Sequence, residues 1–470
     1  MYASGNANRV AHACLTILLA ATSQAQNPTL QWERVGDSGS VLSSTQIEGF
    51  GFRLGSDPLG SLDTLYAVST QGVFGFAPSA DDWMLLCNAS RCRTDYMEVT
   101  SEGYLLIGST AGPASEGERS IDGGRSWEHD VVGVSVTVLF QSTLLSLDRP
   151  VFACNGVFCA RSTEGGAKGS WTAGGPMGGA PAALTEALPS AALPQGRLIG
   201  GAWNGAAYSD DGGGTWMPSS LWGPGRYAVA SVAFLPQEGH PYGGRAFAGV
   251  TDFATGLPGV YRSDDGGGTW TLVRQIESGD FGVADPNWVR VGVDPRIGGA
   301  IYAGIEDNVP GTDPDLGTVV RSPDGGATWE LVADSSNGWG GFAVYLLKVG
   351  RDGRLYVGTD RGVWRTVQPV PVAREPLPGG QHGRGPTIDV WPNPSSTVVH
   401  IWVSVATAAH AGVYILDVSG RLIEVIFEDS ARSGSVALTW DASDVAPGVY
   451  LVVADANGVR RSRRVVISGS

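Results

Sequence analysis

A short pattern recurs through the middle of the chain and constrains its fold more than any other feature. Four segments read Ser-x-Asp-x-Gly-x-Ser/Thr-Trp, and they end at Trp127, Trp216, Trp270 and Trp329. A degenerate copy runs from Ser162 to Trp171, and a remnant survives as Asp81-Asp82-Trp83. We call each copy a box. Such recurrence indicates a fold that uses one supersecondary unit several times.

The box tryptophans fall at positions 83, 127, 171, 216, 270 and 329, at intervals of 44, 44, 45, 54 and 59 residues. This period suits one four-stranded β-propeller blade per repeat. The last repeat lacks a box, but the N-terminal segment 30–35 matches segment 328–332. We therefore expect the first strand to complete the last blade. The prediction is an all-β fold with a seven-bladed β-propeller over residues 26–368, whose strands begin near residue 30.

The boxes resemble the Asp-box, or BNR, repeat of sialidases, xyloglucanases, sortilin-type receptors and photosystem II assembly factors. In those families the box is a structural turn between the third and fourth strands of a blade. The resemblance implies the same role for Asp122, Asp211, Asp265 and Asp324. The Asp accepts backbone hydrogen bonds, the Gly permits the turn, and the Trp packs between sheets.

Residues 1–25 have the features of a secretory signal peptide. An apolar run, 14–21, follows Arg9, and Ser23-Gln24-Ala25 supplies small residues for cleavage. Export favours disulfides, and the remaining cysteines form two Cys-x4-Cys pairs, Cys87 with Cys92 and Cys154 with Cys159. Zinc is the competing interpretation, but neither pair has a neighbouring His. No other segment is apolar enough to cross a membrane.

The charge balance disfavours a nucleic-acid partner. Lys and Arg number 31 against 46 Asp and Glu, which leaves a net charge of −15. A chain this acidic binds phosphate backbones poorly.

The composition changes beyond the propeller region. Residues 369–387 are rich in proline and glycine without periodicity, which predicts a linker. Residues 388–470 carry Asn393-Pro394, Asp417-Val418-Ser419-Gly420, Pro447-Gly448-Val449-Tyr450 and a basic-apolar end. These landmarks resemble the type A C-terminal sorting domain of the type IX (Por) secretion system. The resemblance implies a small immunoglobulin-like β-sandwich, handling by that machinery, and a secreted or outer-membrane surface location reached through the periplasm. An ordinary adhesive sandwich is the alternative.

No catalytic set emerges from the sequence. A sialidase needs an arginine triad and a Tyr nucleophile, for which Arg53, Arg226, Arg290 and Tyr345 are available without any spacing that ties them together. A xyloglucanase-type enzyme needs two facing carboxylates, and the sequence does not place such a pair.

A binding face is easier to predict. Loops between blades, and turns between second and third strands, open on the face opposite the boxes. They carry Trp203, Trp222, Arg226, Tyr227, Trp288 and Trp339. Aromatic faces beside polar groups suit sugar or peptide recognition, whereas the alternative is that these rings pack between blades. The acidic loop with Asp307, Asp313 and Asp315 offers oxygen ligands for calcium, but without the spacing of a known motif.

The favoured hypothesis is a non-enzymatic exported propeller that binds a glycan, a peptide or a cell-surface protein, with no cofactor beyond that calcium. A glycoside hydrolase of sialidase or xyloglucanase type is the second hypothesis, and a scaffold is the third. An enzyme would show convergent carboxylates with perturbed pKa values, whereas a binding module would show an exposed aromatic face.

Overall fold

The structure of the protein is a computed structural model. It describes residues 30–468 except for gaps at 37–41, 43–44, 54–63, 78–80, 93–94, 101–102, 110–115, 134–135, 142–149, 156–157, 188–189, 191, 194–195, 238–239, 242, 295–299, 309–315, 334–336, 351–352, 371–386, 392–393, 396, 406–410, 418–420, 430–433 and 457–458. The predicted signal peptide and most of the predicted linker lie outside the described residues. Across the described part of the chain, no helix has the length and apolar character needed to cross a bilayer.

Residues 32–366 form seven antiparallel sheets of four strands each, which confirms the all-β prediction. Six follow the chain in order: β2 (Ile47–Arg53), β3 (Thr64–Ser69), β4 (Gly72–Ala77), β5 (Asp82–Asn88); β6 (Tyr96–Val99), β7 (Leu105–Gly108), β8 (Glu118–Ser120), β9 (Glu128–His129); β10 (Val138–Gln141), β11 (Val151–Cys154), β12 (Cys159–Ser162), β13 (Trp171–Ala173); β14 (Pro181–Ala187), β15 (Arg197–Ala202), β16 (Gly205–Ser209), β17 (Met217–Pro218); β18 (Tyr227–Pro236), β19 (Gly244–Asp252), β20 (Leu257–Ser263), β21 (Thr271–Gln275); β22 (Pro286–Val293), β23 (Ile301–Asp307), β24 (Leu316–Ser322), β25 (Glu330–Ala333). Two short helical turns, α1 (Ala89–Cys92) and the 3-10 turn η2 (Asp280–Gly282), lie in the connections.

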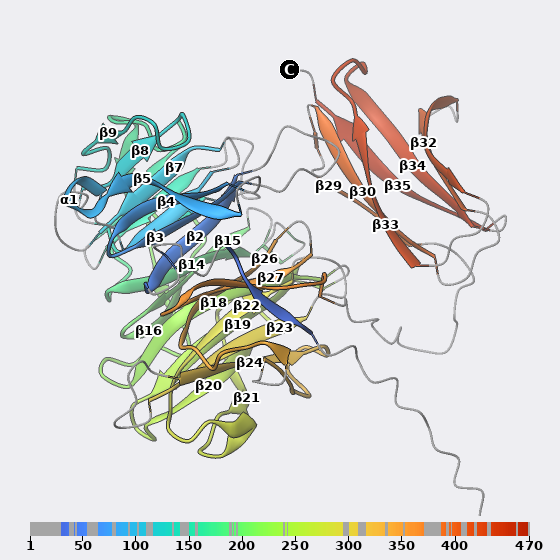
Figure 1. The fold of residues 1–470 in the computed structure, drawn as a ribbon. Coiled ribbons are helices and arrows are strands. Elements are labelled where there is room, and N and C mark those ends of the chain that lie inside the picture. The colour runs from blue at the N-terminus through green and yellow to red at the C-terminus, as the bar shows by residue number, and fades with distance from the viewer. Residues whose placement is uncertain are drawn as a thin grey trace, which may run out of the picture.

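The seventh sheet joins the two ends of this region. Its order is β1 (Trp32–Arg34), β28 (Gly362–Thr366), β27 (Leu355–Thr359) and β26 (Val344–Val349). In Figure 1 the blue first strand lies at the edge of the orange sheet to which β26 and β27 belong. The register pairs Trp32 with Thr366. The first strand therefore completes the last sheet, as the sequence predicted, and covers a sheet edge that would otherwise stay open.

The sheets are arranged as a ring of blades. The first strand of each blade contacts the first strand of the next, from β2 through β6, β10, β14, β18 and β22 to β26, and β26 contacts β2 again. Second strands such as β7 and β11 are buried along their whole length, whereas the outermost β9 and β17 are exposed. Strands buried on both faces read as continuous apolar runs, which explains their sequences.

Each box is a turn between the third and fourth strands. In the Ser209–Trp216 box, the Asp211 carboxylate accepts hydrogen bonds from the Thr215 amide at 2.8 Å and the Thr215 hydroxyl at 2.7 Å. The Ser209 hydroxyl donates to Asp211 and accepts from the Gly213 amide, both at 2.8 Å. Gly213 has a φ of 89°, a conformation that favours glycine. The same bonds recur around Asp122, Asp265 and Asp324.

Both predicted disulfides are formed, Cys87–Cys92 and Cys154–Cys159. The second joins opposed residues of β11 and β12 next to their connecting turn. The first ties the outermost strand β5 to α1. This confirms the cysteine pairing expected of an exported chain.

The C-terminal residues form a two-sheet sandwich with its own core. One sheet holds β29 (Thr387–Trp391), β30 (Val398–Val405) and β33 (Gly434–Asp441), and the other holds β32 (Leu422–Asp429), β31 (Ala411–Asp417), β34 (Gly448–Ala456) and β35 (Val459–Ile467). Trp440 is fully buried in this core, and its ring centroid lies 5.4 Å from that of Tyr450. The Tyr450 hydroxyl donates to the Ala446 carbonyl at 2.7 Å. The Asp417 and Arg421 side chains form an ion pair at 3.0 Å that closes the turn after β31.

Candidate functional site

The two faces of the ring carry different turns. Antiparallel blades place the boxes and the turns between first and second strands on one face, which we call the box face. Connections between blades, and turns between second and third strands, lie on the other, which we call the loop face. All six sequence-predicted ligand residues belong to loop-face segments, but the structure exposes them very differently.

Trp203 is the most exposed of them. It lies in the turn between β15 and β16, and 53% of its surface is exposed. Its ring meets the half-buried ring of Trp288 edge to face, with the centroids 5.5 Å apart and the planes at 74°. Trp288 lies in β22, which belongs to the second blade along from that of Trp203. Two blades thus hold one exposed indole in a defined orientation.

Arg226 and Tyr227 lie on the blade between those two. The Arg226 guanidinium stands 4.7 Å above the Tyr227 ring and 3.5 Å from a carboxylate oxygen of Asp252. The Asp252 carboxylate is the first cause of a raised pKa for Arg226, which therefore stays charged. A third aromatic ring, Phe253, is 47% exposed, and its amide donates to the Arg226 carbonyl at 2.7 Å.

Backbone contacts join these residues into one surface. The Gly223 amide donates to the Asn204 carbonyl at 3.0 Å, and the Thr251 hydroxyl donates to the Asn287 carbonyl at 3.0 Å. We define the aromatic patch as Trp203, Arg226, Tyr227, Phe253 and Trp288. Sequence reasoning missed Phe253, although it occupies the same kind of turn, between second and third strands, that drew attention to Trp203.

Two predicted ligand residues belong to the packing between blades. Trp339 is 2% exposed, its indole N–H donates to the Gly317 carbonyl at 2.9 Å, and its ring lies 5.0 Å from that of Trp32. Trp222 packs partly buried against the core of the neighbouring blades, above Gly178. The burial of Trp339 corrects that assignment, because a ring covered by protein offers no face to a ligand. Trp222 is only partly buried, so its assignment as a ligand residue stays a prediction.

Asp307 anchors a loop. Asp307 is only 5% exposed. Its carboxylate accepts hydrogen bonds from the Ala284 amide at 3.0 Å and the Asp285 amide at 2.7 Å. Its sequence partners Asp313 and Asp315 lie outside the described residues. Within the described ranges, no three His, Cys, Asp or Glu side chains come together as a metal site. Asp307 thus anchors this loop, and calcium binding by the three aspartates stays a prediction.

The innermost strands of the blades share an irregularity near their start. Five of the seven carry a β-bulge near their start, at Glu48, Ala182, Ala230, Asn287 and Tyr345. A bulge leaves one residue unpaired and re-aims its side chain. Such bulges are common beside functional sites.

Glu48 is the acidic residue in this group. Burial raises the pKa of its carboxyl, and the nearby Asp95 raises it further, while Arg290 lowers it. Burial, Asp95 and Glu48 also raise the pKa of Tyr96. Carboxyls in such surroundings suit proton transfer.

Arg290 and Tyr345, two of the residues that a sialidase site could use, are neighbours. The Arg290 guanidinium lies 5.4 Å from the Tyr345 ring and 2.9 Å from a carboxylate oxygen of Glu306. Arg226 pairs with Asp252 in the aromatic patch instead. The side chain of Arg53 lies outside the described residues. Arg226 and Arg290 therefore bind separate carboxylates.

Known structures with a similar backbone include β-propellers. The chain is similar to the extracellular domain of BT4673 from B. thetaiotaomicron, with a TM-score of 0.45, 11% identity, 93% of this chain covered and 58% of that one. It is also similar to the WD40 β-propeller domain of Doa1 (TM-score 0.43, 11% identity, 71% of this chain and 96% of that one). The third is Drosophila semaphorin 1a, extracellular domains 1–2 (TM-score 0.40, 10% identity, 72% and 87%). The chain thus spans 58% of the length of the first of these. No curated protein matches the sequence.

The C-terminal sandwich has a specific counterpart. Residues 389–468 match the family of secretion system C-terminal sorting domains, which confirms the prediction made from Asp417, Tyr450 and the basic end. Such a domain marks a chain for type IX secretion. The protein therefore carries a secretion system C-terminal sorting domain, and it is secreted or attached to the outer-membrane surface.

Proposed function

We propose that the protein is an exported binding module and that the aromatic patch holds a glycan. The observation that carries this proposal is the exposed Trp203 ring, which Trp288 fixes edge-on at 5.5 Å. An exposed indole held rigidly loses little conformational freedom on binding, and its face stacks on the apolar face of a sugar ring.

The charged pair beside the rings supports the same function. Arg226 and Asp252 supply several donors and acceptors next to Tyr227 and Phe253. Sugar hydroxyls need such groups to fix their orientation. The side chain of Arg226 is 56% exposed, so its remaining N–H groups are accessible to a ligand.

A glycan-array screen of the purified protein tests the proposal. We expect binding to at least one class of glycan, and we expect Trp203→Ala to weaken it by about tenfold or more, the loss of one aromatic anchor. Met217→Ala is the matched control, because Met217 is equally exposed at 52% but lies on the outermost strand of the same blade. Equal losses from both variants, or no glycan binding by the wild type, would reject the aromatic patch as a glycan site.

A glycoside hydrolase is the second candidate, because the Asp95 carboxylate lies close enough to Glu48 to add to the raised pKa of the Glu48 carboxyl. In that case Glu48, with its raised pKa, acts as the general acid and Asp95 as the base or nucleophile. A panel of fluorogenic glycosides tests it. Turnover that Glu48→Gln abolishes, while Trp203→Ala changes only the substrate affinity, would favour the enzyme. Glycan binding without turnover of any substrate would favour the binding module.

A further inference from the structure

The Cys87–Cys92 disulfide has one accessible end and one buried end. Cys92 is 0% exposed and packs in the apolar core shared by the first two blades, whereas Cys87 is only partly buried on the outermost strand β5. Thiol–disulfide exchange proceeds by attack of a thiolate on one sulfur and departure of the other. An external thiol can reach Cys87, so Cys87 is the sulfur attacked and Cys92 is the sulfur that leaves.

Departure of Cys92 would place a thiolate in apolar surroundings. Burial disfavours a charged sulfur. A destabilised thiolate is a poor leaving group unless it receives a proton as the S–S bond breaks. Exchange at a bond of this geometry therefore needs an acid beside Cys92.

Glu118 stands at that end of the bond. Its Oε2 lies 3.4 Å from the Cys92 Sγ, and the residue is 2% exposed. A disulfide sulfur carries no proton, so this contact is a hydrogen bond only when the carboxyl is protonated and donates. Burial favours the protonated form, because it is the first cause of a raised pKa for Glu118. The carboxyl is thus placed to pass its proton to Cys92.

His129 connects this carboxyl to solvent. Its Nδ1 lies 3.0 Å from Oε1 of Glu118, and its side chain is 44% exposed. The two residues stand opposite one another on β8 and β9. An imidazole donates a proton at one nitrogen while it accepts one at the other, so His129 can return a proton from water to Glu118. Arg91 and Asp130 are the other charged groups that act on the Glu118 carboxyl, and they shift its pKa in opposite directions.

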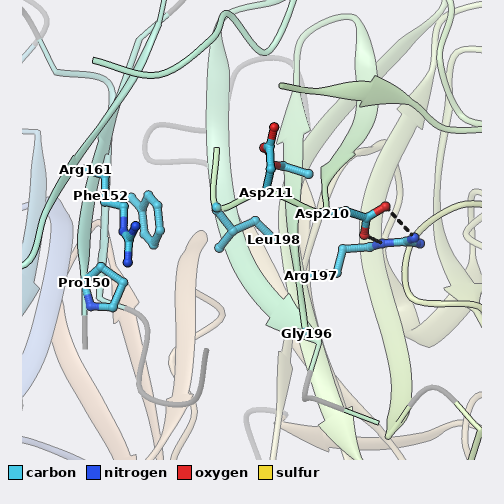
Figure 2. Close-up of a pocket in the computed structure, with 10 residues that line it drawn as sticks. Pro150, Phe152, Arg161, Gly196, Arg197, Leu198, Asp210 and Asp211 are labelled. Carbon is cyan, nitrogen blue, oxygen red and sulfur yellow. Dashed lines mark hydrogen bonds and ion pairs between the residues drawn. The ribbon is translucent and has the colours of Figure 1, made fainter. Parts of the chain in front are cut away.

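The second disulfide lacks this arrangement. Cys154 and Cys159 are each 1% exposed and lie in one apolar core with Phe152 and Leu198, which line a pocket between their blade and the next (Figure 2). Within the described part of the chain, neither sulfur has a hydrogen bond to an ionisable side chain. The Cys154–Cys159 bond offers an outside thiol no accessible sulfur and no acid, so it is an internal reference.

We propose that the Cys87–Cys92 disulfide is a thiol-exchange site in which Glu118 gives a proton to the leaving Cys92 sulfur and His129 restores that proton from solvent. The co-reactant is an external thiol. Its thiolate attacks the Cys87 Sγ, a new S–S bond forms there, and the electron pair of the broken bond passes to the Cys92 Sγ, which takes the proton.

A second external thiolate then attacks the outer sulfur of this mixed disulfide and releases Cys87 as a thiol. Two external thiols are oxidised to one disulfide, and the protein disulfide is reduced to two thiols. The site belongs to the first two blades and does not depend on the aromatic patch.

Reduced glutathione is the probe, applied to the full chain under native conditions. Alkylation traps the thiols as they appear, and mass spectrometry follows each cysteine pair separately. We expect Cys87–Cys92 to open at least about tenfold faster than Cys154–Cys159, with glutathione trapped on Cys87 and not on Cys92.

Substitution of the acid separates proton transfer from mere exposure of the bond. Glu118→Gln should slow the opening at least about tenfold, because an amide cannot transfer the proton. Glu128→Gln is the matched control, since Glu128 precedes His129 but pairs with Arg119 at 3.5 Å, and it should leave the rate unchanged. Faster opening in Glu118→Gln alone would show an ionised carboxylate that only repels the Cys92 thiolate, and it would overturn the proposal.

The wild-type pH profile tests the same step without a substitution. The observed rate divided by the thiolate fraction of glutathione measures the reactivity of the protein bond itself. We expect this quotient to fall as the pH rises through the raised pKa of Glu118, and to be constant in Glu118→Gln. If that variant also speeds the opening of Cys154–Cys159, it has loosened the fold and the wild-type profile decides. A wild-type quotient that does not change with pH, or equal rates in wild type and Glu118→Gln, would overturn the proposal.

Discussion

The Trp32 ring, from the first strand of the chain, packs 5.0 Å from that of Trp339, which precedes the first strand of the last blade. The Trp32 indole N–H reaches the Val332 carbonyl of the preceding blade at 2.9 Å. β1 has three residues, so much of its hold on the ring comes from this one side chain. Trp32 therefore links the closure of the ring to the packing around Trp339.

Trp32→Ala should destabilise the whole ring. Trp32 is 5% exposed, and truncating a buried aromatic side chain costs about 3–5 kcal/mol of unfolding free energy. Denaturant unfolding followed by tryptophan fluorescence and circular dichroism measures this loss. Trp203→Ala removes an equally large but exposed ring and should cost less than about 1 kcal/mol. Similar losses for the two variants would contradict the role assigned to Trp32.

The box aspartates should make stability depend on acid. Hydrogen bonds, first from the Thr215 amide, hold the pKa of Asp211 below its ordinary value. A lowered folded-state pKa means that the stabilisation is complete above the unfolded-state pKa, about 4, and is lost as pH falls through the folded-state value.

Asp211→Asn should therefore lower the melting temperature at neutral pH, at a cost of about 1 kcal/mol, and the difference from wild type should shrink below pH about 4. Thermal unfolding over a pH series measures it. Asp444→Asn, at an exposed position of the C-terminal sandwich, controls for the loss of one negative charge. A difference that stays constant with pH would show that the box carboxylate contributes shape but no charge-dependent bonds.

Glu48 should show the opposite pH dependence. Burial raises the pKa of its carboxyl, so folding penalises the charged form. The penalty is absent below the unfolded-state pKa and complete above the folded-state value. Glu48→Gln should raise the melting temperature at neutral pH and leave it unchanged near pH 3. Destabilisation by Glu48→Gln at neutral pH would instead indicate that the charge itself holds the inner strands together.

The Cys154–Cys159 disulfide should stabilise the blade formed by β10 to β13. Both sulfurs are buried, and the bond clips β11 to β12 next to their turn. Replacing both cysteines by serine should cost about 2 kcal/mol of unfolding free energy, the low end for such a short loop. The double Ser variant at Cys87 and Cys92 tests the less buried bond beside α1 and should cost less. Chemical denaturation without reductant compares the two variants. A larger loss of unfolding free energy for the Cys87 and Cys92 variant would contradict this ranking.

Local patterns in the sequence were sufficient for the architecture. The spacing of the box tryptophans predicted the repeat, and the match of segment 30–35 to 328–332 predicted how the last blade is completed. The roles of Ser, Asp and Gly in each box follow from bonds between residues at most four apart in the chain. Such short-range bonds are encoded locally, so they can be inferred from one copy and checked on the next.

The site was decided by contacts between blades. Trp203 and Trp339 belong to similar loops, but Trp339 is covered by Trp32 from the other end of the chain, whereas Trp203 meets Trp288 and stays exposed. The sequence by itself determined the repeated blade, its turns, its disulfides and the sorting domain, because each depends on residues close together in the chain. Exposure of the rings depends on residues tens to hundreds of positions apart, so the tertiary structure alone decided which rings are available to a ligand.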